Sequence, residues 1–287
     1  MLKEGGVYVS AYNLKVYKYN GYLQFRIYSK PIFISDNDTD KNEKEKEENF
    51  LREKGFLDDK EIGKKNYKSD EERLARVQKV SINRTIQSIY EYALNNDWDW
   101  FCTFTFSSDS IDRNDYKLVM SRIRKWCNHI KTRKCKDMKY LLVPEKHKKG
   151  GYHVHGLFSH CDGLTFVDSG RVAVGKKAYK RTLLNSNYPT IYNVADWKNG
   201  FSTATRIVSS AKCASYICKY ITKDLCIELK NYRRFYPSSN LKRAEQCIYN
   251  MSYEDIEEWI KSYEVDYMKT QHIAEAGQTI KYITVLI

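Results

Sequence analysis

The sequence predicts an α+β fold with a central antiparallel sheet and flanking helices. Short apolar runs that alternate with polar residues, as strands do, occur near the start of the chain and around residues 140–158. Longer segments carry their apolar residues at helical spacing. From residue 70 onward the expected order is helix, strand, helix, paired strands, loop, strand and helix, which is typical of α+β domains.

Four segments are expected along the chain. Residues 1–35 alternate as an N-terminal β segment. Residues 36–69 hold mostly Asp, Glu, Lys and Asn, and we expect a charged linker or an exposed insertion there. Residues 70–245 contain the chemical motifs and form the main domain. Residues 246–287 are expected to form a C-terminal helix and strand.

Local signals place the individual elements. Asn20-Gly21 is expected to form a hairpin turn between the first two strands. Ser252 suits the N-cap of a helix that ends near Tyr263. The other expected elements are helices over residues 70–95 and 113–132 and strands over residues 101–106, 140–143 and 279–287.

The composition favours a nucleic-acid partner. The chain has 287 residues, of which 42% are hydrophobic, enough for one substantial core. Its formal net charge of +13 favours DNA or RNA, because neutralised phosphates release counterions. Basic residues crowd the predicted helix over 113–132, where Arg122, Arg124 and Lys125 are candidate DNA contacts. The alternative is a solvated helix face.

Cysteine usage and hydropathy indicate the compartment. Eight cysteines are scattered without a CxxC pair, which argues against a zinc knuckle and provides no disulfide framework. No apolar stretch approaches the roughly 20 residues needed to cross a bilayer, and the first residues lack the apolar core of a signal peptide. We therefore expect a protein of the reducing cytoplasm without a membrane partner.

One segment approaches the P-loop pattern without meeting it. In Gly170–Lys177, Lys177 stands where Ser or Thr would bind Mg2+, and the segment lies in a predicted loop and strand. We therefore expect neither nucleotide binding nor a helicase domain in this chain.

Two histidines in a strand-like run are the strongest chemical signal. His153 and His155 lie within Gly151–Phe158, and because side chains alternate across a strand, both imidazoles project from one face. Imidazole is a common ligand of divalent metal ions, and a buried face would favour apolar residues instead. The pattern predicts a pair of metal ligands. The alternative is two half-exposed histidines on a sheet edge.

A second signal lies in Ala211–Leu225, which has no Gly or Pro and is predicted to be a helix. At about 100° per residue, one side of this helix carries Tyr216, Lys219, Tyr220 and Lys223. A phenol beside ammonium groups can attack a phosphodiester, because the lysines stabilise phenolate and phosphate charge. Since the chain holds 24 tyrosines, the second one can occur by chance, and Tyr216 is the favoured nucleophile.

The histidine strand and the tyrosine helix together resemble the HUH endonucleases, in particular the rolling-circle replication initiators (Rep proteins) of plasmids and single-stranded-DNA phages. His153-Val154-His155 is followed about sixty residues later by the tyrosine and lysine pattern of the two-tyrosine class. Phe101–Phe106 is similar to the family's first motif, and Trp197–Phe201 to the approach to its tyrosine helix. The resemblance covers about residues 70 to 245 and implies an antiparallel, RRM-related sheet.

A third metal ligand is expected at Glu145. Tyr140–Val143 and the histidine strand are predicted to form a hairpin around residues 147–151, whose register brings Glu145 close to His153. The resemblance implies an acidic or polar third ligand and a divalent metal ion, Mg2+ or Mn2+. The alternatives are a solvated ion pair between Glu145 and the basic turn, and participation of His147 instead.

The resemblance implies a metal-dependent nickase and strand transferase. Tyr216 or Tyr220 would attack origin DNA, forming a 5′-phosphotyrosyl bond and a free 3′-hydroxyl, and would later rejoin strands. Lys219 fits the family's lysine between the tyrosines. The further candidate DNA contacts are Lys148, Lys149, Thr103, Thr105 and Lys223, the last with a solvent-facing charge as its alternative.

The implied partners are single-stranded origin DNA, including hairpin forms, a host helicase and a DNA polymerase in a bacterial cytoplasm. Two other classes stay open from the sequence. An HUH transposase or relaxase would share the chemistry. A non-catalytic single-stranded nucleic-acid-binding protein would use the same histidines and tyrosines for packing and stacking.

Overall fold

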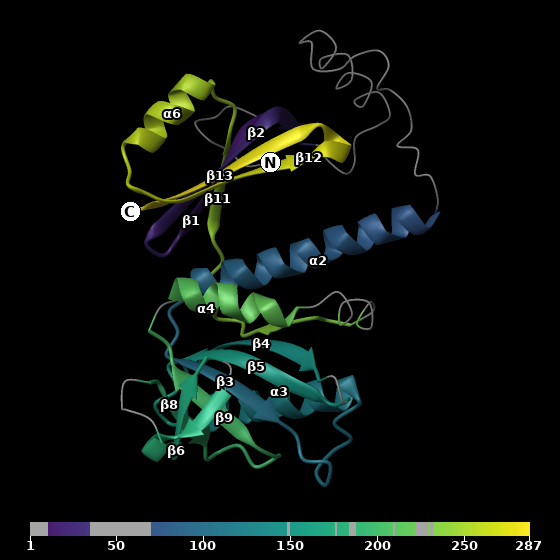
Figure 1. Ribbon diagram of the computed structural model, residues 1–287, viewed down its shortest axis with the longest axis vertical. Coiled ribbons are helices and arrows are strands. Elements are labelled where there is room, and N and C mark those ends of the chain that lie inside the picture. The colour runs from purple at the N-terminus through teal and green to yellow at the C-terminus, as the bar shows by residue number, and fades with distance from the viewer. Residues whose placement is uncertain are drawn as a thin grey trace. The chain divides into compact units, whose positions relative to one another are not determined.

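The structure, a computed structural model, describes residues 11–34, 70–147, 150–175, 177–183, 188–208, 210–221, 225, 229 and 232–287. They form an α+β fold with two antiparallel sheets, which confirms the predicted fold class (Figure 1). The chain divides into a smaller unit, residues 1–70 and 244–287, and a larger unit, residues 71–243. The predicted linker at residues 36–69 lies outside the described residues.

The smaller unit is a five-stranded sheet in the order β11-β1-β2-β13-β12. Its elements are β1 (Ala11–Tyr19), β2 (Tyr22–Phe33), β11 (Glu245–Tyr249), α6 (Tyr253–Lys261), β12 (Val265–Ile273), a 3₁₀ turn (Ala274–Ala276) and β13 (Gln278–Leu286). The predicted turn joins β1 and β2, with Gly21 at φ +79°, a value that glycine adopts without strain. The predicted cap of α6 is also present, because Ser252 accepts a hydrogen bond from the Asp255 N–H.

The core of the smaller unit joins segments far apart in the sequence. Strand β13 pairs with β2, placing Ile280 opposite Tyr28. The apolar side of α6 packs on one face of the sheet, and the buried cluster there consists of Leu14, Val16, Phe25, Ile27, Ile256, Ile260, Ile283 and Val285. Residues 1–35 and 246–287, taken as separate segments in the sequence, thus contribute strands to one sheet.

The larger unit contains an eight-stranded antiparallel sheet in the order β10-β4-β5-β3-β9-β8-β6-β7. Its strands are β3 (Trp100–Thr105), β4 (Lys139–Lys146), β5 (Tyr152–Ser159), β6 (Phe166–Val174), β7 (Lys177–Lys180), β8 (Thr190–Val194), β9 (Ser202–Arg206) and β10 (Tyr236–Pro237). Its helices are α2 (Asp70–Leu94), α3 (Tyr116–Arg133) and α4 (Ser210–Ile217), with 3₁₀ turns at Arg181–Leu183 and Cys218–Tyr220.

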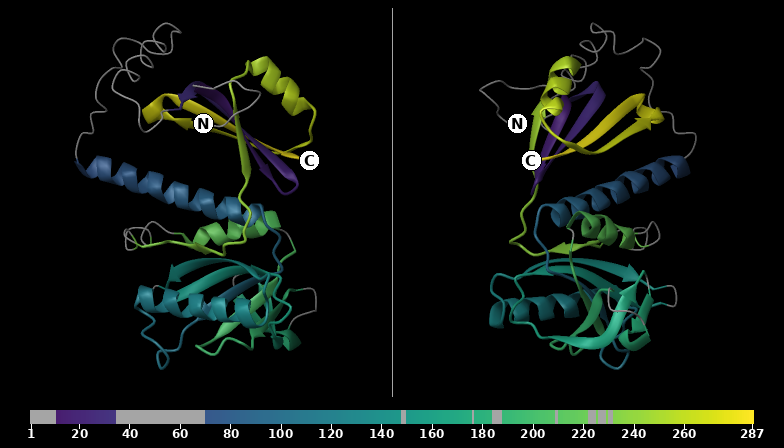
Figure 2. Two further views of the ribbon diagram at one scale, coloured as in Figure 1. Left: turned by 180° about the vertical axis from the view of Figure 1, so that it is seen from behind. Right: turned by 60° about the vertical axis from the view of Figure 1, so that its left-hand side comes forward.

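Helix α3 covers one face of this sheet and α4 lies over the other (Figures 1 and 2). The Trp126 ring of α3 packs against Phe104 and Phe158, with ring centroids 5.1 and 6.4 Å apart. Glycine is required at position 156 on the same face, because a Cβ there would lie 2.5 Å from the Phe158 ring. Alternation along β5 therefore directs His153 and the other odd-numbered side chains toward the α4 face.

The helix predicted over residues 211–225 is wrong beyond Ile217. Helix α4 ends at Ile217, the next three residues form a 3₁₀ turn, and Ile221 is extended at φ −85° and ψ 96°. β-branched isoleucines and Cys218 have weaker helix propensity than Ala or Leu, and Ile221 is buried at 6% exposure. Packing of Ile221 thus competes with continuation of the helix. Tyr220 consequently belongs to the 3₁₀ turn.

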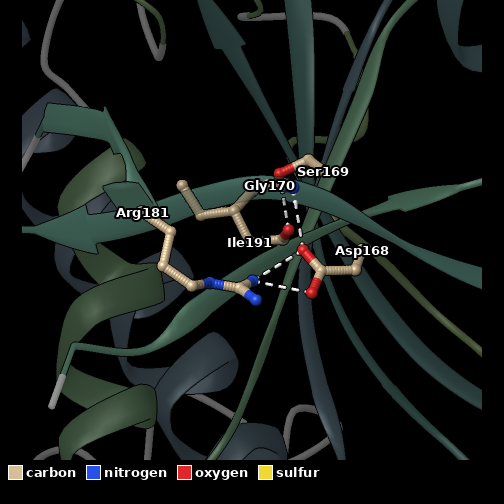
Figure 3. Close-up of polar contacts among 5 residues, drawn as sticks. All are labelled: Asp168, Ser169, Gly170, Arg181 and Ile191. Atoms are coloured by element: carbon tan, nitrogen blue, oxygen red, sulfur yellow. Dashed lines mark hydrogen bonds and ion pairs between the residues drawn. The ribbon is translucent and has the colours of Figure 1, made fainter. Parts of the chain in front are cut away.

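The β6–β7 hairpin is held at its base by polar contacts (Figure 3). Arg181 donates hydrogen bonds to both oxygens of Asp168 at 2.7 Å, and Asp168 accepts another from the Gly170 N–H at 2.8 Å. The Ser169 hydroxyl donates to the carbonyl of Ile191 at 2.6 Å. These contacts stabilise β6 where its pairing register with β8 shifts.

Three sequence features are seen in the described residues. The near-P-loop segment forms the end of β6, a turn at Gly175 and the start of β7. The seven cysteines in this part of the chain are all free thiols, whereas Cys226 lies outside it. Across the same residues, we find no helix with the length and apolar character that a membrane crossing requires.

Candidate functional site

Three strands place a group of polar side chains on the α4 face of the larger sheet. Strands β4 and β5 form a hairpin with Glu145 opposite His153, the register expected from the sequence. On the other side of β5, strand β3 places Thr103 opposite His155 and Thr105 opposite His153. Directly opposite residues in an antiparallel pair project from the same face, so all five side chains lie together. We call these five residues the histidine cluster.

A threonine of β3 contacts the Nδ1 atom of each histidine. Thr103 Oγ1 lies 3.0 Å from Nδ1 of His155, and Thr105 Oγ1 lies 3.4 Å from Nδ1 of His153. The Nε2 atom of His155 lies 2.7 Å from Oε2 of Glu145. A ring proton on Nδ1 is donated to threonine and leaves Nε2 with a lone pair, whereas a proton on Nε2 is donated to Glu145.

The electrostatics of the histidine cluster favour the protonation states that bind cations. The hydrogen bond with His155 holds the pKa of Glu145 below its ordinary value despite partial burial. Burial lowers the pKa of His153, and the neighbouring His155 and His147 lower it further. An ionised carboxylate and a neutral imidazole are the forms that coordinate a metal ion.

The donor types of the histidine cluster suit Mg2+ or Mn2+. Within the described chain, no three His, Cys, Asp or Glu side chains already stand as a ligand set for one ion. The side chains of His153, His155 and Glu145 nevertheless supply two nitrogens and a carboxylate, and the threonine contacts at Nδ1 are of the kind that orient metal-binding histidines. His147 adds a neighbouring imidazole, whose ring centroid lies 5.4 Å from that of His153.

Both candidate tyrosines reach the histidine cluster. The Tyr220 ring stacks on His155, with centroids 3.5 Å apart and planes 15° apart. Tyr216 packs edge-on against Tyr220 at 5.5 Å. The Nζ atom of Lys219 lies 5.4 Å from the centre of the Tyr216 ring, a cation–π distance. The 3₁₀ turn thus joins the tyrosines, Lys219 and a histidine in one place.

The two tyrosines differ in access to solvent. Tyr216 is 38% exposed, whereas Tyr220 is half-buried against His155. Burial, followed by a hydrogen bond with Tyr216, raises the pKa of Tyr220 well above its ordinary value. Phenolate formation at Tyr220 is therefore disfavoured in this arrangement.

Phe101 is a contact residue of the site that the sequence did not identify. Its ring centroid lies 5.2 Å from Tyr216, 6.2 Å from Tyr220 and 5.9 Å from His155. The available signal was its position two residues before Thr103, which puts both on one strand face. Phe101 is therefore the apolar surface on which both tyrosines rest.

A cleft of about 590 Å³ opens beside these rings. Its lining combines Tyr216, Tyr220 and Phe101 with hydroxyl and basic side chains from neighbouring strands, namely Thr103, Thr203, Thr205, Arg206 and Lys177. Hydroxyl and basic groups contact phosphate oxygens in nucleic-acid complexes, and aromatic rings stack on unpaired bases. The contributions of β7 and β9 depend on sheet order and were not expected from the sequence.

The predicted DNA contacts lie in different places. Thr103 and Thr105 contact the histidines. Arg122, Arg124 and Lys125 are exposed on α3, which covers the opposite face of the sheet. There Arg122 donates to Asn199 at 3.1 Å, and the Arg124 guanidinium lies 5.3 Å from the centre of the Tyr236 ring. Lys148, Lys149 and Lys223 lie outside the described residues.

The fold and the site define a class of protein: an α+β protein whose antiparallel sheet carries two histidines and a carboxylate beside a tyrosine-bearing helix. Within this class, residues 99–225 match the family model of the replication-associated protein ORF2. The matched segment contains the histidine cluster and both tyrosines, and it supports a role as a replication initiator. No curated protein and no solved structure matches the chain significantly.

Proposed function

We propose that the chain is a replication initiator that nicks single-stranded origin DNA by tyrosine attack and later rejoins the strands. The observation that carries this proposal is the stacking of Tyr220 on His155 with Tyr216 beside it, at the mouth of one cleft. Charge supports a nucleic-acid substrate, because residues 71–243 hold 32 Lys and Arg against 15 Asp and Glu, a net charge of +17.

Tyr216 is the first nucleophile in this proposal, because it is the more exposed phenol. Its Oη atom attacks the scissile phosphorus, and the bond from phosphorus to the 3′-oxygen breaks. The 5′-phosphate stays on the tyrosine, and the departing oxygen takes up a proton to become a 3′-hydroxyl. The ester keeps the energy of the broken linkage, so a 3′-hydroxyl can attack it and reseal the strand. Lys219 stabilises negative charge on the phenol and the phosphate.

His153, His155 and Glu145 hold a divalent ion, Mg2+ or Mn2+, in this proposal. When bound, such an ion stabilises the charge that builds on the scissile phosphate. Thr103 and Thr105 fix the imidazole rings so that their Nε2 atoms face the substrate side. The same hydroxyls therefore act through the histidines rather than by contacting DNA.

Tyr220 is the nucleophile of the later strand transfer. Its ring leaves His155 when the first tyrosine carries DNA, because a second phosphodiester needs the same place beside the histidine cluster. The free 3′-hydroxyl of the nicked strand serves as a primer for a DNA polymerase. Strand separation is assigned to a host helicase.

The test is capture of the covalent intermediate. The full chain is incubated with Mn2+ and single-stranded oligonucleotides of random sequence, labelled in parallel at the 3′ or the 5′ end. The 3′-label is expected on the protein in a denaturing gel, and the 5′-label on a released strand, because the downstream fragment stays attached through its 5′-phosphate. Tryptic mass spectrometry then identifies the tyrosine, and removal of Mn2+ with a chelator abolishes the adduct.

Tyr216→Phe is expected to abolish adduct formation, whereas Tyr179→Phe is a matched control because Tyr179 on β7 is also 38% exposed. Full adduct formation by Tyr216→Phe would assign the first attack to Tyr220. Retained oligonucleotide binding without an adduct on any sequence would contradict the proposal and support a non-catalytic single-strand binder.

A further inference from the structure

Strand β12 forms one edge of the smaller sheet. It pairs with β13 alone, so the backbone groups on its outer side have no strand partner among the described residues. Proteins usually interrupt such an edge with proline, a bulge or a short strand, because it can pair with another chain. β12 has nine residues without proline, and its bulge lies at its start, between Val265 and Tyr267. The stretch Tyr267–Ile273 is a regular edge.

The side chains along this edge are exposed and partly apolar. Met268 is 59% exposed and Tyr267 53%. The right-hand view of Figure 2 shows the yellow strands β12 and β13 extending past the purple strands on the side away from α6. A groove of about 680 Å³ remains between α6 and the outer strands, lined by Met268, Ile256, Ile260 and Ile283 among others. An apolar groove beside an unpaired strand suits a partner that adds a strand.

The sequence of β12 is complementary to itself. In two copies paired antiparallel about a two-fold axis at Met268, each Met268 faces its counterpart on the α6 side of the sheet, where it also adjoins Ile283. On the other side, Tyr267 faces Lys269 twice, a favourable contact between an aromatic ring and a cation. An axis at Lys269 would instead oppose two lysines.

The opposite edge is less suited to a partner. Strand β11 has only five residues, and its first is Glu245. Pairing of β12 with β11 of another molecule would also be head-to-tail and produce open chains, whereas pairing of β12 with itself closes after two copies. We propose that a second copy of this chain binds along β12, joining the two five-stranded sheets into one. This inference concerns the smaller unit alone and does not depend on the proposed nickase activity.

The first test measures the mass of the full chain by sedimentation equilibrium, from about 1 µM to about 200 µM, the range expected for a small interface. We expect a concentration-dependent dimer. Met268→Glu places two carboxylates at the axis and is expected to weaken the dimer at least about tenfold, whereas Met268→Leu retains it. Circular dichroism checks that both variants of this exposed position are folded. A monomer at every concentration, or a dimer unaffected by Met268→Glu, overturns the proposal.

The second test measures the register. Opposed residues of antiparallel strands have Cα atoms within disulfide range, so Met268→Cys is expected to form a covalent dimer on mild oxidation. Glu258→Cys, at an exposed position of α6, is the matched control and should stay monomeric under the same conditions. The parent protein corrects for its own thiols, including exposed Cys247. Equal crosslinking of Glu258→Cys and Met268→Cys would contradict pairing along β12.

Discussion

The two units share a plan, an antiparallel sheet with a helix packed on it, yet they differ in charge and in the faces of their sheets. The larger unit has a net charge of +17, and the smaller holds 17 Lys and Arg against 21 Asp and Glu, a net charge of −4. The α4 face of the larger sheet carries the histidine cluster, whereas α6 covers an apolar cluster. Side chains on one sheet face, rather than the shared plan, therefore locate the chemistry.

The largest expected effect lies in the histidine cluster. His155→Ala removes the ring that contacts Glu145, Thr103 and Tyr220, and we expect adduct formation to fall about 10³-fold, the size of loss of one key electrostatic group. The measurement is the initial rate of adduct formation with Mn2+. His272→Ala, an exposed position of β12, is the control and should match the parent protein. Equal losses in both variants would remove the distinction between the units.

A core substitution in the smaller unit tests whether the two sheets have separate roles. Leu14 is fully buried, so Leu14→Ala should lower the free energy of unfolding by about 3 kcal/mol, through lost burial and a residual cavity. Leu286→Ala, at 40% exposure, should have little effect. Urea unfolding measures the stability. Adduct formation per folded molecule should stay unchanged, and a parallel loss would show that the smaller unit supports the chemistry.

The threonine contacts sharpen the account of the larger sheet. Thr103→Val keeps the shape of the side chain but removes the hydroxyl next to Nδ1 of His155. We expect the Mn2+ concentration for half-maximal adduct formation to rise about 10- to 100-fold, as for other groups that orient metal-binding histidines. Thr203→Val, opposite Thr103 on β9, is the control. If Thr203→Val raises the Mn2+ requirement equally, the effect belongs to the cleft as a whole.

The smallest effects compare one helix in each unit. Asp115 caps α3 by accepting from the N–H groups of Lys117 and Leu118, and Ser252 caps α6. Asp115→Ala and Ser252→Ala should each cost about 1 kcal/mol of stability. Thermal unfolding of the two variants measures these costs. If the variants lower different transitions, the units unfold separately, whereas a shared single transition shows that they unfold together.

The parts of the site that were predictable depend on short-range pairing. A turn of a few residues fixes the register of the β4–β5 hairpin, so the sequence was sufficient to place Glu145 opposite His153. The caps and the Asn20-Gly21 turn were equally local. The proximity of the tyrosine segment to the histidines required the family resemblance, because nothing local states which sheet face α4 covers.

The parts that were not predictable depend on tertiary packing. Periodicity continues through residue 225, but burial of Ile221 ends the regular helix and brings Tyr220 onto His155. Thr103 and Phe101 stand in a strand whose neighbours come from residues 153–158 and 202–206, so their contacts could not be assigned from the strand itself. The smaller sheet likewise joins residues about 250 positions apart.

That long-range joining has a consequence during synthesis on the ribosome. Strand β2 emerges early, but its partner β13 emerges only after the whole of residues 71–243 has left the exit tunnel. The first hairpin must therefore wait with an uncovered apolar face while the larger unit folds. Nascent chains stalled before residue 278 should accordingly contain a protease-resistant larger unit and a protease-sensitive first hairpin.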